Sequence, residues 1–198
     1  MKKLAVIGAH GVGKTTLCHL LSDYANSQLK RSVKVLGELA RECPFPINEK
    51  MGYDTAEWII LSQILQEREA VFKEKVRIHQ KKRVVDLCDI VICDRCAYDP
   101  YIYFKLLNKL PYRSNKIFQL AISHLWTYDR FILIEPSGKL LEEDGLRMTD
   151  LSFQLKVHRE FVRDIESLPA INKKLTILKA EAVFDYPEFT VKEIFACL

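Results

Sequence analysis

The sequence has few of the residues that interrupt regular structure, with 7 glycines and 7 prolines among 198 residues. This composition excludes collagen-like and low-complexity proteins. No apolar run approaches the 18 or more residues that span a membrane. The amino-terminal apolar run is short and leads into glycines, so it indicates a strand and not a signal peptide. We therefore expect a single domain, residues 1–198, in the cytoplasm.

The chain also lacks the residue spacing of a structural zinc site. Its one CxxC pair, Cys93 and Cys96, has neither a second pair nor spaced histidines to complete such a site. We interpret the six cysteines as reduced thiols. The formal net charge of +4 is too small to indicate a nucleic-acid-binding surface by itself.

Short apolar runs alternate with longer helical patterns, which is typical of βαβ units. The expected strands are Lys3–Ile7, Val33–Leu36, Ile90–Cys93, Phe131–Ile134 and Leu175–Leu178. Each run is nearly all apolar, as expected for parallel strands that helices cover on both faces. The predicted fold class is therefore α/β, with a central parallel sheet of about five strands and helices on both faces.

A long helix is expected to begin near Asp54, which can cap it while Glu57 completes a capping box. Apolar residues then recur at helical spacing, and the sequence predicts that they form the core stripe of this helix. They are Trp58, Leu61, Leu65, Phe72 and Val76.

The most specific pattern is a glycine-rich loop between the first expected strand and a helix. Its residues are Gly8, Ala9, His10, Gly11, Val12, Gly13, Lys14, Thr15 and Thr16, which contain GxxxxGK[ST]. The amides of such a loop and the positive end of the following helix bind phosphates. Lys14 reaches the β- and γ-phosphates, and the Thr15 hydroxyl can ligate Mg²⁺. We predict binding of ATP with Mg²⁺, and GTP remains open.

Polar residues follow two further expected strands, at the edge of the sheet where the loop lies. Asp94, after the third strand, is a candidate Mg²⁺ carboxylate, and Arg95 can hold a substrate or phosphate group. Glu38, after the second strand, can orient or deprotonate an attacking hydroxyl, and Arg41 can pair with it or bind an anion. A surface ion pair explains Glu38 and Arg41 equally well.

A charged segment bracketed by proline and glycine follows the fourth expected strand, at residues 136–150. It is typical of a lid that closes over phosphates, excludes water and brings Arg147 to the transferring group. An ordinary polar surface loop is the alternative.

The segments GAHGVGKTTL, GELAREC, WIILSQILQERE, ICDRCAYDPYIYF and EEDGLR together resemble the P-loop kinase-like family that includes ribosylnicotinamide kinases, often labelled AAA-type ATPase domains. The resemblance to thymidylate and deoxynucleoside kinases is more distant. It implies that Glu38 contacts the acceptor hydroxyl, that Asp94 and Arg95 serve metal and substrate, and that Arg147 serves the phosphates. It also makes Trp58 and Gln63 the nearest matches to the aromatic residue and the glutamine that hold the base in deoxynucleoside kinases, with Gln63 kept as the candidate. The chain departs from many monophosphate kinases, which carry several lid arginines; Arg147 alone favours a neutral or singly charged acceptor.

Other P-loop classes fit the sequence less well. None of the three Asn-Lys pairs is followed by the Asp of a guanine-binding motif, and Arg95 stands where a motor ATPase would carry a water-polarising Glu. We therefore expect γ-phosphoryl transfer from ATP to a hydroxyl of a small nucleoside-like or nucleotide acceptor. Two alternatives remain open: a regulatory ATP- or GTP-binding protein without kinase activity, and a kinase of nucleic-acid 5′-hydroxyl ends.

Overall fold

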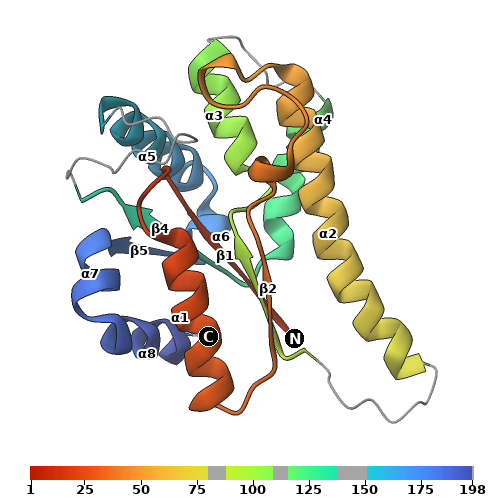
Figure 1. Cartoon of the computed structure of the whole chain (residues 1–198), viewed down its shortest axis with the longest axis vertical. Coiled ribbons are helices and arrows are strands. Elements are labelled where there is room, and N and C mark those ends of the chain that lie inside the picture. The colour runs from red at the N-terminus through yellow and green to blue at the C-terminus, as the bar shows by residue number, and fades with distance from the viewer. Residues whose placement is uncertain (80–87, 109–115, 138–150, 198) are drawn as a thin grey trace.

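The computed structural model describes residues 1–79, 88–108, 116–137 and 151–197. Its core is a sheet of five parallel strands in the order β2-β3-β1-β4-β5 (Figure 1). The strands are β1 (Lys2–Gly8), β2 (Val33–Leu36), β3 (Ile90–Asp94), β4 (Arg130–Glu135) and β5 (Leu175–Lys179). This sheet confirms the predicted α/β class, and each expected strand is present within two residues of its predicted ends.

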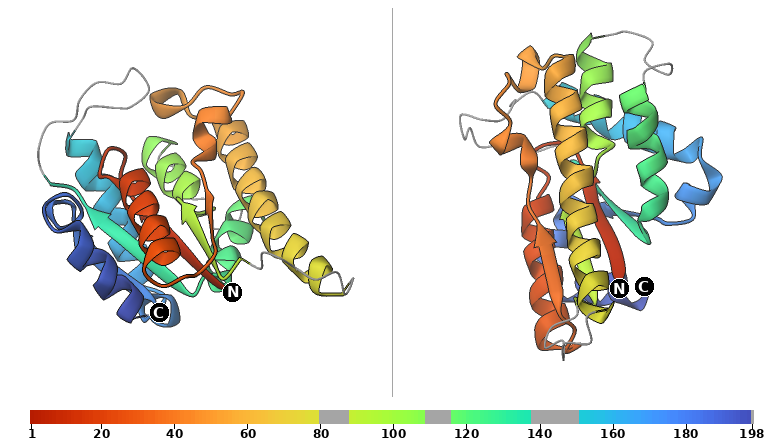
Figure 2. Two further views of the ribbon diagram at one scale, coloured as in Figure 1. Left: turned by 60° about the horizontal axis from the view of Figure 1, so that its bottom comes forward. Right: turned by 90° about the vertical axis from the view of Figure 1, so that its right-hand side faces the viewer.

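Helices cover the sheet on both sides (Figure 2). They are α1 (Lys14–Ser27), α2 (Tyr53–His79), α3 (Asp99–Asn108), α4 (Lys116–His124), α5 (Leu151–Glu166), α6 (Pro169–Asn172), α7 (Ala180–Asp185) and α8 (Pro187–Ala196). Short 3-10 turns occupy Leu39–Glu42, Asn48–Lys50 and Leu125–Thr127. Helices α1 and α8 pack together, while α2, α3 and α5 follow one another on the opposite side. In the described part of the chain, no helix has the length and apolar character to cross a membrane.

The middle of the sheet is the most apolar part of the molecule. Strands β1, β3 and β4 are buried along almost their whole length, because helices cover both of their faces. Residues beyond their carboxyl ends therefore meet at one edge of the sheet, which is where open α/β sheets bind ligands. The glycine-rich loop follows β1, the central strand, and lies in the middle of that edge.

Helix α2 differs from its sequence-based description in two respects. It begins at Tyr53, so Asp54 lies in its first turn and not at the N-cap that a capping box requires. The predicted core stripe is wrong as well, because Leu61 and Leu65 are 45% and 60% exposed. Phe72 and Val76 lie beyond the part of α2 whose side chains the structure describes.

The buried face of α2 carries apolar residues, among them Ile60 and Ile64, together with the polar Gln63 and Glu67. The two polar residues belong to a group that we call the Glu67 cluster: Glu67, Gln63, Lys3, His124 and Tyr128. The Glu67 carboxylate, 1% exposed, accepts hydrogen bonds from Lys3 Nζ at 2.7 Å and from His124 Nε2 and Gln63 Nε2 at 2.8 Å. The Tyr128 hydroxyl donates to it at 2.5 Å. A buried carboxylate is tolerated only with such partners, and these come from β1, from α4 and from the segment before β4.

Candidate phosphotransfer site

The loop after β1 has the backbone conformation that a phosphate-binding loop needs. Gly8, Gly11 and Gly13 have φ values of 138°, 71° and 92°, which side-chain-bearing residues rarely adopt. A Cβ atom at Gly8 would also lie 2.8 Å from the backbone oxygen of Ile134. Helix α1 begins at Lys14, directly after the loop, so its free amides point toward the space that the loop surrounds.

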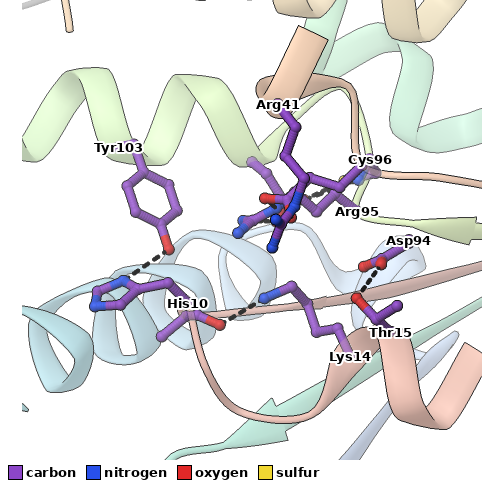
Figure 3. A network of polar contacts seen from close by, with 11 residues as sticks. His10, Lys14, Thr15, Arg41, Asp94, Arg95, Cys96 and Tyr103 are labelled. Atoms are coloured by element: carbon purple, nitrogen blue, oxygen red, sulfur yellow. Dashed lines mark hydrogen bonds and ion pairs between the residues drawn. The ribbon is translucent and has the colours of Figure 1, made fainter. Parts of the chain in front are cut away.

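Lys14 lies buried inside this loop. Its Nζ atom donates a hydrogen bond to the backbone oxygen of Ala9 at 2.6 Å (Figure 3). Burial is the main cause that lowers the pKa of Lys14 to about 7; the nearby positive charge of Arg95 adds to it, and the nearby carboxylates oppose it. The loop therefore holds a poorly solvated ammonium group that gains from a bound anion.

Thr15 and Asp94 form a pair of oxygen donors beside Lys14 (Figure 3). The Thr15 hydroxyl donates to Asp94 Oδ2 at 2.5 Å. Asp94 is only 2% exposed, and its Oδ1 atom has no hydrogen-bond partner among the described residues. A buried carboxylate oxygen without a partner, next to a hydroxyl and a phosphate-binding loop, has the chemistry that a Mg²⁺ ion requires. These two residues therefore fit the predicted metal.

The backbone at Arg95 is strained, and its side chain joins two carboxylates. Arg95 has a φ of 82°, a conformation that costs free energy in a residue with a side chain. Its Nε atom donates to Glu38 Oε1 at 2.6 Å, and NH1 donates to Asp99 Oδ1 at 3.3 Å. Arg41 donates to the other oxygen of Glu38 at 3.4 Å. The predicted pairing of Glu38 with Arg41 is therefore present, with Arg95 as the closer partner.

These neighbours keep the Glu38 carboxylate ionised. Burial by itself raises the pKa of Glu38, but the positive charges of Arg95, Lys14 and Arg41 outweigh this effect and lower the pKa to about 2. Glu38 is thus a weak base. It is better suited to accept a hydrogen bond from a hydroxyl and orient it than to remove its proton.

A cavity opens beside this charged group, between the segment after β2 and helix α3. Its lining residues combine an apolar wall with the charged groups just described: His10, Glu38, Ala40, Arg41, Ile47, Asn48, Met51, Thr55, Ile59, Arg95, Asp99, Pro100 and Tyr103. We call it the acceptor cavity. The phosphate pocket of the loop is lined by Gly11, Gly13, Lys14, Thr15, Thr16, Glu38, Arg95 and Phe184. Glu38 and Arg95 line both spaces, which therefore adjoin.

His10 connects the loop to two helices. Its ring Nδ1 lies 3.3 Å from the Tyr103 hydroxyl on α3 (Figure 3), and its ring stacks on Phe153 of α5 with centroids 6.2 Å apart. Gln154 Nε2 donates to the His10 backbone oxygen at 2.7 Å. The sequence alone indicated no role for the His10 side chain. In the structure, residues of α3 and α5 hold His10 in place, and His10 also lines the acceptor cavity.

The structure brings most of the predicted site residues together, with two exceptions. Gln63 lies away from the acceptor cavity, because its amide donates to Glu67 in the buried cluster. Arg147 and most of the predicted lid, 136–150, lie outside the described residues. Sequence reasoning also missed Phe184 of α7, whose ring contacts the loop; a Cβ atom at Gly13 would lie 2.7 Å from its Cζ atom. No local pattern around Phe184 indicates this contact, because β5 and α7 bring it there.

The sheet order and the glycine-rich loop define an α/β domain with a P-loop. Residues 3–183 match the family model described as "AAA domain", and the chain belongs to this family. A solved NadR protein in complex with NAD and AMP-PNP is similar, with 21% identity and a TM-score of 0.56 over 93% of this chain. The present chain spans 49% of that protein's length.

A thymidylate kinase from Ehrlichia chaffeensis is also similar in fold. The identity is 20% and the TM-score is 0.57, over 90% of this chain and 86% of the kinase. At these identities the two structures establish the shared fold alone. No curated protein matches the sequence.

Proposed function

We propose that this protein is an ATP-dependent phosphotransferase. It moves the γ-phosphoryl group to a hydroxyl of a small nucleoside-like or nucleotide acceptor, with Mg²⁺. The observation that carries the proposal is that Glu38 and Arg95 line both the phosphate pocket and the acceptor cavity. A γ-phosphate in the one space and a hydroxyl in the other would therefore meet at these two side chains, as in-line transfer requires.

Each residue of the site has a role that follows from its position. The loop amides and Lys14 hold the β- and γ-phosphates, and the charge of the bound phosphates favours the protonated form of Lys14. Glu38 accepts a hydrogen bond from the acceptor hydroxyl and orients its oxygen toward phosphorus. Arg95, held between Glu38 and Asp99, offers positive charge to the transferring group at the junction of the two spaces.

The Thr15 hydroxyl and the Asp94 carboxylate are the residues that would hold Mg²⁺. The ion neutralises charge on the β- and γ-phosphate oxygens when it is bound. Asp94 is fixed at the end of β3, and Thr15 at the start of α1, so both oxygen donors are oriented before any ligand arrives.

The test is ADP release from Mg-ATP by the purified protein, measured with nucleosides, nucleoside monophosphates and 5′-hydroxyl oligonucleotides as acceptors. We expect one small-molecule class to stimulate release and Lys14→Ala to abolish the stimulation. Tight nucleotide binding without stimulation by any acceptor would instead support a regulatory nucleotide-binding protein. Stimulation by oligonucleotides, with binding that weakens steeply as salt rises, would support a nucleic-acid end kinase.

A further inference from the structure

The most exposed large hydrophobic side chains of the described residues lie where α7 meets α8. Tyr186 and Phe189 are 67% and 66% exposed, the two highest values among them, and Phe184 is 56% exposed. These three rings lie within six consecutive residues, at the point where α7 ends and α8 begins. A single exposed hydrophobic residue is ordinary on a protein surface, but a group of large ones indicates an interaction site.

The packing of α8 explains why Phe189 stays outside. Strand β5 is at the edge of the sheet, and α7 and α8 follow it at the rim of the molecule, beside α1 (Figures 1 and 2). Helix α8 packs on α1 and buries Val191 and Ile194. Phe195 of α8 also stacks on Tyr24 of α1, with ring centroids 5.7 Å apart. This contact uses the buried face of α8, so Phe189 is left on the face toward solvent.

Carboxylates accompany the exposed rings, in a group that we call the aromatic corner: Phe184, Asp185, Tyr186, Glu188 and Phe189. Both acidic residues of the aromatic corner are exposed. Residues 181–193 contain four acidic residues and one lysine, a net charge of −3, whereas the whole chain has a net charge of +4. The aromatic corner is therefore an acidic and aromatic surface on a basic protein.

Aromatic faces beside carboxylates are the surroundings that a guanidinium group favours. Its plane stacks on an aromatic ring while its N–H groups donate to a carboxylate. A lysine ammonium is more strongly hydrated and has no plane to stack, so it gains less from the same surface. We propose that the aromatic corner is a docking surface for an arginine-bearing segment of a partner protein.

The charge of the aromatic corner disfavours other occupants. If two copies of the chain met corner to corner, the carboxylates of both would face each other across the contact. Anionic lipids and nucleic acids carry the same sign of charge and are repelled as well. A docked segment would lie beside the candidate phosphotransfer site, because Phe184 also lines the phosphate pocket. The proposal does not depend on the proposed function.

The test is fluorescence anisotropy with a labelled eight-residue peptide in which arginine and glycine alternate. Two matched peptides carry lysine or the uncharged arginine analogue citrulline in place of arginine. We expect the arginine peptide to bind, the lysine peptide to bind at least about threefold more weakly, and the citrulline peptide not to bind. The net positive charge of the protein opposes non-specific attraction of the cationic peptides, so their binding requires the acidic surface.

Variants of the aromatic corner locate the binding. The double variant Tyr186→Ala/Phe189→Ala should raise the dissociation constant of the arginine peptide by about tenfold, and Glu188→Gln by about threefold. Two control variants lie on other parts of the surface and should leave this constant unchanged. Trp126→Ala removes a ring that is 54% exposed before β4, and Glu166→Gln neutralises an exposed carboxylate at the end of α5.

Several outcomes would overturn the docking surface. They are no binding of the arginine peptide up to about 1 mM, equal binding of the lysine or citrulline peptide, and an unchanged dissociation constant in the double variant. Self-association in sedimentation that the double variant abolishes would show a second copy as the occupant instead. Binding to zwitterionic lipid vesicles that the double variant abolishes would show a lipid surface.

The docking surface and the phosphotransferase fail in different ways. Arginine-peptide binding through the aromatic corner, without stimulation of ADP release by any acceptor, would refute the phosphotransferase and keep the docking surface. Acceptor-stimulated ADP release without peptide binding would refute the docking surface and keep the phosphotransferase.

Discussion

Lys14 shows how a single residue prepares the loop for an anion. Its ammonium group is buried, and its pKa lies at about 7 in the protein without nucleotide. Bound phosphates add negative charge beside Nζ and raise this pKa again. Nucleotide binding above neutral pH is therefore coupled to the uptake of a proton by Lys14.

This coupling predicts a pH-dependent affinity for ATP. Above about pH 7, where free Lys14 loses its proton, the dissociation constant of Mg-ATP should rise by up to about tenfold per pH unit. The measurement is calorimetric titration in buffers of different ionisation enthalpy, which also counts the proton taken up. In Lys14→Arg the guanidinium stays protonated, so its affinity should change little with pH over the same range. A flat profile in the unchanged protein would contradict the lowered pKa.

Glu38 leads to a second prediction at this scale. Because its pKa is about 2, it is a carboxylate throughout the neutral range. In the proposed function it therefore acts through a hydrogen bond to the acceptor hydroxyl. Glu38→Gln should lower kcat for transfer by about 100-fold and change the dissociation constant of ATP by less than about threefold. Glu42→Gln is the control, because Glu42 is exposed on the same 3-10 turn. Full transfer activity in Glu38→Gln would refute the assigned role.

At the scale of elements, α2 shows where the sequence was misleading. The apolar spacing selected Leu61 and Leu65 for the core, yet the helix buries Gln63 and Glu67. Two partners of Glu67 are far away along the chain: Lys3 is 64 residues distant and His124 is 57 residues distant. A pattern within α2 cannot reveal them. Hydrophobic periodicity therefore located the helix, but α2 buries the stripe that contains Ile60 and Ile64 and not the one that was selected.

The Glu67 cluster predicts a large loss of stability when its centre is removed. Glu67→Ala should lower the free energy of unfolding by about 3–5 kcal/mol, because it leaves the ammonium of Lys3 buried without its partner. Leu65→Ala, at an exposed position of the same helix, should change it by less than about 0.5 kcal/mol. Denaturant unfolding of both variants measures the difference. If Leu65→Ala lowered the free energy of unfolding more than Glu67→Ala does, the core stripe predicted from the sequence would be correct after all.

At the scale of the whole molecule, the sequence predicted what depends on local pattern and missed what depends on long-range packing. Five apolar runs were sufficient for the strands and their parallel arrangement, and one loop motif predicted the glycine-rich turn between β1 and α1. Glu38 and Arg95 were expected beside the loop, since strand ends converge in such sheets. Phe184 could not be predicted, because its contact with Gly13 depends on how β5 and α7 pack beside the loop.

The fold also carries a cost for its function, since it buries the Lys14 ammonium before any anion is bound. The pKa of Lys14 is lower in the folded protein, about 7, than its ordinary value of 10.5 in the unfolded chain. Between these two pH values the unfolded chain binds more protons, so stability rises with pH. The loss of folding free energy caused by the buried charge is fully present below about pH 7 and disappears as the pH approaches about 10.5.

Lys14→Met tests this cost, because methionine has a similar length and no charge. Without nucleotide at pH 7, we expect its free energy of unfolding to exceed that of the unchanged protein by about 1–2 kcal/mol. The difference should shrink as the pH rises toward 10, where unchanged Lys14 is neutral in the folded state.

Saturating Mg-ATP should stabilise the unchanged protein by about 2.7 kcal/mol at 100 times the dissociation constant and leave Lys14→Met unaffected. Thermal and denaturant unfolding measure both effects. A less stable Lys14→Met at neutral pH would show that the hydrogen bond to Ala9 outweighs the buried charge.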